Sequence, residues 1–154
     1  MNSIGIRCTP HQIFYTVLNF ENEEFSTLNQ VLVIPKSFDK PNKLKYIRKT
    51  FLDIFKEYNI ITAGIRVTEH NAPSVDLFRI MLEAVIQELI ASSNVEYYFT
   101  GVISSISSKL GIPNDGQFKF IIDGTNSFLE INDWNTFSKE HRECILVGYA
   151  SNNR

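Results

Sequence analysis

The order in which strand-like and helix-like segments follow one another constrains the fold of this chain more than any other feature of its sequence. Residues 3–9, 12–20 and 25–34 are short runs rich in β-branched and aromatic residues. Pro10 and a polar turn separate these runs, and Pro35 ends the third. Such runs are typical of β-strands. Because the connections between them are short, we expect an antiparallel meander.

The next part of the chain alternates between helical and extended patterns. Beyond Pro41, apolar residues recur three or four positions apart, which predicts an amphipathic helix. These residues are Leu44, Ile47, Phe51, Phe55 and Tyr58. Residues 60–68 and 95–99 are typical of strands, and residues 75–91 of a helix capped by Ser74. Strands joined by helices require crossover connections, so we expect these later strands to be parallel.

The C-terminal third is less regular. We expect a short helix over residues 102–110 and a final helix that is capped by Thr136 or Ser138 and ends near Ala150. Residues 117–133 fit a strand or a helix equally well. A chain of 154 residues can bury one core of its own. The sequence therefore predicts a single α/β domain over residues 1–154, in which three antiparallel strands precede alternating helices and strands.

Charge and composition exclude several classes of protein. The formal net charge of −2 gives no overall basic field, so a nucleic-acid partner would need a local basic patch. Residues 75–91 form the longest apolar stretch, but too many charged side chains interrupt it for a membrane span. The N-terminus lacks the pattern of a secretory signal, so we expect a cytoplasmic protein without a membrane partner. Cys8 and Cys144 lie too far apart in sequence for a CxxC motif, and we expect both to be buried.

The order of elements resembles the ribonuclease H-like superfamily, and most closely its RuvC-like branch, which includes small bacterial proteins of unknown function. The resemblance extends over nearly the whole chain. It includes the apolar-Gly-apolar triplet Ile4-Gly5-Ile6 in the first strand and an acidic helix at the end of the chain. The resemblance implies a nuclease site in which carboxylates from the first strand, the fourth strand and the last helix hold two Mg²⁺ or Mn²⁺ ions.

This chain departs from the acidic pattern of that branch at two strands. Arg7 follows the triplet where the resemblance implies a carboxylate, and Arg66 lies near the end of the fourth predicted strand. An arginine stays protonated and would repel a divalent cation. We therefore expect Arg7 and Arg66 to form ion pairs with Glu69 and Glu143, with no metal and no cofactor bound.

These departures leave two functions open. The first is a catalytically degenerate interaction or assembly module, a pseudo-nuclease associated with nucleic-acid-processing partners. The alternative is an active metal-dependent nuclease with a rearranged site built from Glu69, Glu140 and Glu143. His70, next to Glu69, could assist such a nuclease, although a histidine in a loop after a strand is more commonly solvated.

A local excess of basic residues precedes and occupies the first predicted helix. The segment holds six of the fifteen basic residues: Lys36, Lys40, Lys43, Lys45, Arg48 and Lys49. Lys45 and Lys49 share one face of the helix, where they could bind phosphates or an acidic partner, with Lys40 and Lys43 nearby. The alternative is a solvated helix face, because acidic residues flank the segment and no aromatic residues are interleaved with it.

The helix predicted over residues 75–91 is apolar around most of its circumference. A helix of this kind needs burial on more than one side, either within its own domain or against a second protein. We expect a homodimer or a complex with another protein, with Leu82 and Ile86 at the interface.

Overall fold

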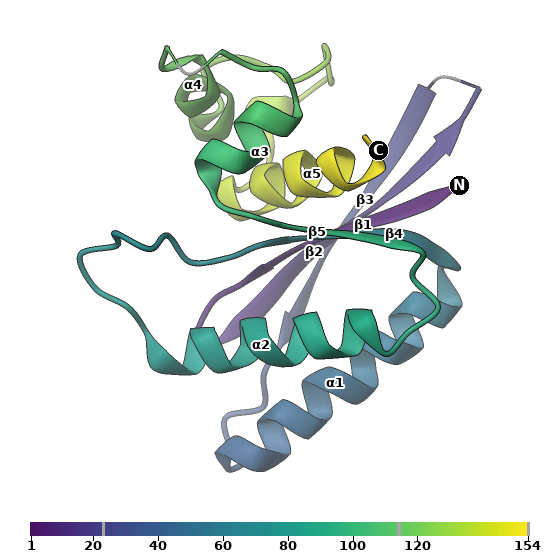
Figure 1. The fold of residues 1–154 in the computed structure, drawn as a ribbon, viewed down its shortest axis with the longest axis vertical. Helices are drawn as coiled ribbons and strands as arrows, with labels where there is room; N and C mark the ends of the chain where they lie inside the picture. The colour runs from purple at the N-terminus through teal and green to yellow at the C-terminus, as the bar shows by residue number, and fades with distance from the viewer. Residues whose placement is uncertain (23, 114, 154) are drawn as a thin grey trace.

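The computed structural model describes residues 1–22, 24–113 and 115–153. Glu23, Asn114 and Arg154 lie outside the described residues. One mixed sheet divides the structure into two layers of helices, with α1 and α2 on one face and α3, α4 and α5 on the other (Figure 1).

The sheet contains five strands in the order β3-β2-β1-β4-β5. Their bounds are Asn2–Cys8 for β1, Gln12–Glu21 for β2, Glu24–Val33 for β3, Ile60–Arg66 for β4 and Tyr97–Gly101 for β5. The first three strands pair antiparallel, whereas β4 pairs parallel with β1, and β5 parallel with β4. This arrangement confirms the predicted fold class, a mixed sheet in which a meander precedes crossover strands.

The helices are α1 (Lys40–Glu57), α2 (Leu77–Ala91), α3 (Ile103–Lys109), α4 (Gln117–Asp123) and α5 (Lys139–Asn152). Part of the ambiguous segment 117–133 thus forms α4, and a 3₁₀ turn over Trp134–Thr136 follows it. Gly116 and Gly124 flank α4 with φ angles of 94° and 88°, a backbone conformation that glycine adopts without strain. Phe118 and Ile122, four residues apart, bury the same face of α4. None of the helices described is long and apolar enough to cross a membrane.

Side-chain caps set where the main helices begin. Asp39 accepts a hydrogen bond from the Asn42 N–H at 3.0 Å, and Ser138 accepts one from the His141 N–H at 3.1 Å. Ser138 is one of the two caps expected for the last helix. Helix α2 begins at Leu77, because Asp76 accepts the Arg79 N–H at 2.9 Å. The prediction of Ser74 as its cap was wrong.

Leu82 and Ile86 are fully buried in the core between the sheet and the layer formed by α1 and α2. Helix α2 packs against both α1 and the sheet, so it covers these two side chains within the chain itself. This corrects the expectation that they lie at an interface with another protein. The large apolar side chains of α2 that stay exposed are Leu77, Ile80 and Met81.

Helix α5 lies unusually close to the sheet because three glycines leave room for it. A Cβ atom on Gly5 would lie 1.7 Å from the carbonyl oxygen of Cys144, and one on Gly64 would lie 2.2 Å from that of Val147. Gly148 faces Gly5 from the helix side. The glycine of the Ile4-Gly5-Ile6 triplet therefore has a packing role, which brings α5 directly over β1 and β4.

Candidate functional site

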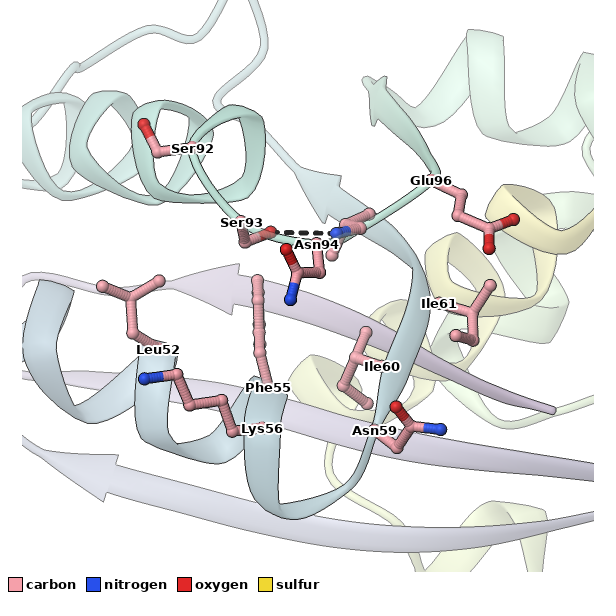
Figure 2. A pocket seen from close by; sticks show the side chains of 11 residues that line it. Leu52, Phe55, Lys56, Asn59, Ile60, Ile61, Ser92, Ser93, Asn94 and Glu96 are labelled. Carbon is pink, nitrogen blue, oxygen red and sulfur yellow. Dashed lines mark hydrogen bonds between the residues drawn. The ribbon is translucent and has the colours of Figure 1, made fainter.

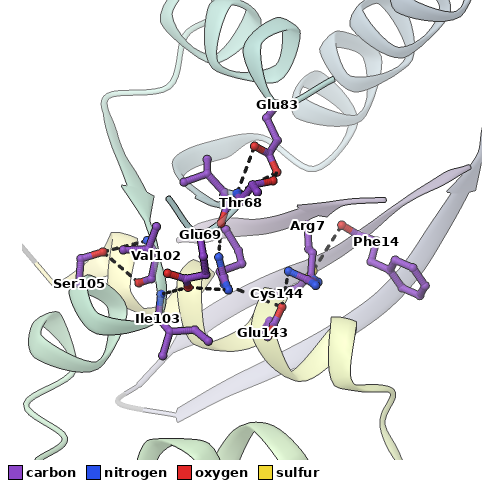
Figure 3. A network of polar contacts seen from close by, with 12 residues as sticks. Arg7, Phe14, Thr68, Glu69, Glu83, Val102, Ile103, Ser105, Glu143 and Cys144 are labelled. Carbon is purple, nitrogen blue, oxygen red and sulfur yellow. Dashed lines mark hydrogen bonds and ion pairs between the residues drawn. The ribbon is translucent and has the colours of Figure 1, made fainter. Parts of the chain in front are cut away.

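The candidate site lies where β1 and β4 end, beneath the first turns of α5. In the parallel register of β1 and β4, Arg7 pairs with Arg66, so the two arginines lie side by side at one edge of the sheet. Because α5 packs directly against Gly5 and Gly64, the Glu143 side chain reaches the two arginines. Figure 3 shows Glu143 next to Arg7, with Glu69 approaching from the loop after β4.

Three ion pairs join these residues. Arg7 Nη1 lies 2.7 Å from Glu143 Oε2, and Arg66 Nη2 lies 2.8 Å from Glu69 Oε1. Arg66 Nε is also 4.0 Å from Glu143 Oε2, so one carboxylate faces two guanidinium groups. The side chains of Glu143 and Arg66 are only 3% and 5% exposed, which places this network largely out of water.

Burial disfavours the charged form of Arg66, whereas the neighbouring carboxylates favour it. Desolvation lowers the pKa of the Arg66 guanidinium, and the negative charges of Glu143 and Glu69 act against that shift. Arg66 Nη1 also donates to the backbone carbonyl of Val67. Since arginine does not lose its proton in proteins, Glu143 has a permanent positive neighbour at any useful pH.

A further ion pair, absent from the sequence predictions, completes the network. Arg79 Nε donates to Glu83 Oε1 at 3.0 Å, and Glu83 also accepts the backbone N–H and the hydroxyl of Thr68. Glu83 is buried, although it lies on a mainly apolar helix. The spacing of Arg79 and Glu83 by four residues was the available signal for this pair. We refer to Arg7, Arg66, Arg79, Glu69, Glu83 and Glu143 as the Arg–Glu cluster.

An open cavity of about 360 Å³ adjoins the cluster. Its lining includes all three arginines, together with Glu69 and Asp76. Several buried guanidinium nitrogens form no hydrogen bond within the described residues: Arg7 Nε and Nη1, Arg66 Nε and Arg79 Nη2. Arg7 Nη1 thus lies at ion-pair distance from Glu143 without the alignment of a hydrogen bond. Glu143 Oε2 is likewise buried without a hydrogen bond to any residue that the structure describes, so both donors and an acceptor of the cluster lack aligned partners there.

The remaining predicted site residues lie elsewhere or have structural partners. No ion pair joins Glu140 to the cluster in the part of the chain that the structure describes. Glu69 accepts the backbone N–H of Ile103 at 2.9 Å, which anchors the start of α3. His70 is exposed, whereas the His141 imidazole contacts Ser138 and the backbone carbonyl of Gln30. Neither histidine belongs to the Arg–Glu cluster.

The residues of the cluster do not fit a divalent metal. In residues 1–22, 24–113 and 115–153, no group of three or more His, Cys, Asp or Glu side chains lies close enough to hold a metal ion. Glu143 faces two guanidinium groups instead. A hard cation would need several carboxylate oxygens on one side of it, whereas arginine charge lies there in this chain.

The lysines of the predicted basic patch lie in different environments. Lys45 and Lys49 line a groove on α1, and Lys43 Nζ lies 5.6 Å from the centre of the Phe78 ring on α2. Lys40, the first residue of α1, is exposed. Phe38 and Tyr46 line the same groove as Lys45 and Lys49, so aromatic side chains do accompany the lysines. This corrects the interpretation that the patch lacks them.

A larger cavity of about 650 Å³ lies between the C-terminal ends of α1 and α2 (Figure 2). It is located at the start of β4, whereas the Arg–Glu cluster lies where β4 ends. Apolar side chains such as Leu52, Phe55 and Ile60 share its lining with Asn59 and Asn94. Figure 2 shows no convergence of carboxylates in it comparable with the cluster.

Comparisons with known proteins yield matches to solved structures. No protein-family model matches the sequence, and no curated protein matches it either. RuvC of Thermus thermophilus has a TM-score of 0.70 with 9% identity, over 97% of this chain and 92% of RuvC. The yeast mitochondrial Holliday junction resolvase Ydc2 has a TM-score of 0.60 with 15% identity, over 96% of this chain and 75% of Ydc2.

A viral protein extends the comparison. The fowlpox virus resolvase, solved with Holliday junction DNA, has a TM-score of 0.52 with 10% identity, over 97% of this chain and 95% of the resolvase. At identities this low, the likeness establishes the arrangement of the elements and not the chemistry of the site. The chain has the ribonuclease H-like fold of RuvC and other Holliday junction resolvases.

Proposed function

We propose that this chain is a catalytically degenerate RuvC-like domain that acts as an interaction or assembly module. The observation that carries the proposal is the ion pair between Arg7 and Glu143, at the edge of the sheet where β1 and β4 end. In a two-metal nuclease, divalent ions neutralise the carboxylates and stabilise both the attacking and the leaving oxygen. Here arginines neutralise the carboxylates.

A guanidinium group supplies charge without the other properties of a metal ion. It cannot coordinate water and lower its pKa, and it has no vacant coordination position for a phosphate oxygen. Three arginines face three glutamates in the Arg–Glu cluster, so its charge is balanced by the chain itself. This balance supports a stable site that carries out no hydrolysis.

We infer that the partners of the module include nucleic acid or proteins that process it. Two of the structural neighbours were solved with Holliday junction DNA, namely T. thermophilus RuvC and the fowlpox virus resolvase. Arg7, Arg66 and Arg79 line the cavity, and guanidinium groups are well suited to phosphate, which supports contact with a phosphate group there. We therefore propose binding of branched or duplex nucleic acid without cleavage.

We also propose self-association through the exposed apolar side of α2. Leu77, Ile80 and Met81 are 74%, 39% and 41% exposed, and their spacing places them on one face of the helix. Exposed apolar side chains grouped in this way are typical of protein interfaces. They replace Leu82 and Ile86 as the proposed contact residues.

A cleavage assay tests the proposed function. The purified protein is incubated with Mg²⁺ or Mn²⁺ and a labelled Holliday junction, duplex or single strand of DNA or RNA, and binding is followed separately by gel shift. We expect no metal-dependent products. Metal-dependent cleavage that Glu143→Gln abolishes, and that an equivalent Glu88→Gln substitution on the α2 surface leaves intact, would instead support the metal-dependent nuclease built from Glu69, Glu140 and Glu143.

A further inference from the structure

A groove of about 320 Å³ on the outer side of α1 combines aromatic and basic side chains. Its lining consists of Phe38, Asn42, Lys45, Tyr46 and Lys49. Its volume lies within the range of small-ligand sites. Helix α1, which carries most of the groove, lies on the face of the sheet opposite to α5, the helix that carries Glu143 (Figure 1).

The aromatic wall of the groove is supported by contacts within the chain. Phe38 directly precedes Asp39, the cap of α1, and its backbone N–H donates to the Pro35 carbonyl at 3.3 Å. The Phe38 and Tyr46 rings meet edge to face, with centroids 5.9 Å apart. Despite this support, 41% of Phe38 stays exposed. An aromatic ring that packs against a neighbouring ring and stays partly open to solvent offers a surface for stacking.

The two lysines of the groove have no acidic partner in the described part of the chain. Among the basic residues of α1, Arg48 pairs with Glu88, and Lys43 lies over the Phe78 ring. Lys45 and Lys49 are exposed and stand one helical turn apart, about 6 Å along the axis. Two like charges at this spacing repel each other unless an anion lies between or beside them.

We propose that this groove binds a segment of single-stranded nucleic acid. One base stacks on the exposed ring of Phe38 beside Tyr46, and the adjoining phosphates contact the ammonium groups of Lys45 and Lys49. Stacking on aromatic side chains together with backbone contacts to basic residues is the usual way in which proteins bind single strands without sequence preference. This binding site goes beyond the proposed function, because it involves none of the Arg–Glu cluster.

The chemistry of the groove favours a nucleic acid over an acidic peptide. Carboxylates are best bound by the planar fork of arginine, whereas lysine serves as a point charge that suits phosphates. Both positive groups of the groove are lysines, and the neighbouring Arg48 is occupied by Glu88. An acidic peptide would also leave the flat face of Phe38 without a matching planar group.

Fluorescence anisotropy tests the proposal with two labelled probes. The first is an oligo(dT) of about 12 nucleotides, within the usual site size of ~4–16 nucleotides. The second is an abasic phosphodiester strand of equal length, which offers phosphates without bases. Phe38→Ala should weaken oligo(dT) binding about 5- to 150-fold and leave abasic-strand binding unchanged, because only stacking is lost. Lys45→Ala/Lys49→Ala should weaken binding of both probes.

The salt dependence separates the two contributions. For single strands, the slope of log K against log[salt] is about −0.7 per phosphate contact. The double lysine variant removes two contacts, so its slope should be less negative by about 1.4. Phe38→Ala should leave the slope unchanged. Phe38→Leu serves as a second variant that keeps apolar volume against Tyr46 and removes the π-face, in case Phe38→Ala unfolds.

Matched controls lie on the other layer of the structure. Phe120→Ala removes an equally exposed phenylalanine, at 49% exposure, and Lys119→Ala/Lys139→Ala removes the same charge from exposed positions. Both should bind oligo(dT) like the wild type. Oligo(dT) binding that is insensitive to the groove variants would overturn the proposal. The proposal would also be overturned if neither strand binds and a glutamate-rich peptide binds in a way that depends on Lys45 and Lys49. Neither result depends on whether the cleavage assay detects products.

Discussion

Arg7 Nη1 lies 2.7 Å from Glu143 Oε2, although the two residues come from the first strand and the last helix of the chain. The contact depends on glycine: α5 can approach β1 only because Gly5 has no side chain. The same close approach would bring a carboxylate on β1 next to Glu143, so the identity of residue 7 decides between an acidic site and a neutral one.

Removal of Arg7 should destabilise the fold. Arg7→Ala leaves the 3% exposed Glu143 with only the more distant guanidinium of Arg66, and breaking a buried ion pair costs about 3 to 5 kcal/mol. Arg48→Ala is the matched control, since Arg48 pairs with Glu88 at the surface, where a pair contributes at most about 1 kcal/mol. Urea denaturation measures both. Equal midpoints for the two variants would show that the cluster does not stabilise the fold.

Replacement of Arg7 by a carboxylate should create an affinity for metal. Arg7→Asp places two carboxylates next to each other with one positive charge fewer between them, which favours a bound divalent cation. We expect Mn²⁺ to raise the melting temperature of this variant but not of the wild type, because a ligand that binds only the folded state stabilises it. Arg48→Asp makes the same charge change at an exposed site and should show no such response. A wild-type protein stabilised by Mn²⁺ to the same extent would contradict the prediction.

Two substitutions on the exposed side of α2 should dissociate the proposed assembly and leave the monomer folded. Leu77→Glu and Met81→Glu place charge where a partner would bury it, which is costly only in the complex. Analytical ultracentrifugation measures the assembly, with circular dichroism as the folding control. Tyr98→Glu alters a 54% exposed side chain on β5 and should leave the assembly intact. A wild-type protein that stays monomeric at high concentration would exclude self-association.

A substitution in the core of the same helix provides the contrast. Leu82→Glu should unfold the chain instead of dissociating an assembly, because Leu82 is fully buried between the sheet and α1. The loss of helical circular dichroism would show this directly. A Leu82→Glu protein that is folded but monomeric would show instead that Leu82 lies at the interface.

Alkaline pH should weaken the fold through its buried thiols. Burial raises the pKa of both Cys8 and Cys144 above the ordinary thiol value. A raised folded-state pKa gives stability that is complete below the unfolded-state pKa of about 8.5 and is lost as the pH rises above it. Cys144→Ser keeps a donor for the Phe14 carbonyl, 3.3 Å from Cys144 Sγ, and removes this ionisation. Urea midpoints between neutral and alkaline pH should therefore fall less steeply for Cys144→Ser than for the wild type, and parallel curves would contradict the assignment.

The sequence by itself determined the order of the elements and the presence of an arginine near the end of the first strand. Periods of two and of three to four residues distinguish strands from helices, and short connections between the first three strands leave only a meander. Arg7 was evident because it directly follows the triplet Ile4-Gly5-Ile6. These features are local, so a pattern of neighbouring residues suffices to predict them.

Tertiary structure alone decided which distant side chains meet. A helix that is apolar around most of its circumference does not indicate which face will meet the sheet, so Leu82 and Ile86 could not be distinguished from Leu77 and Met81 by pattern. Arg79 reaches the cluster because of where α2 crosses the sheet. Phe38 likewise lines one groove with Lys45 and Lys49, because its ring packs against Tyr46 of α1. Such convergence depends on packing between elements, which no local sequence pattern records.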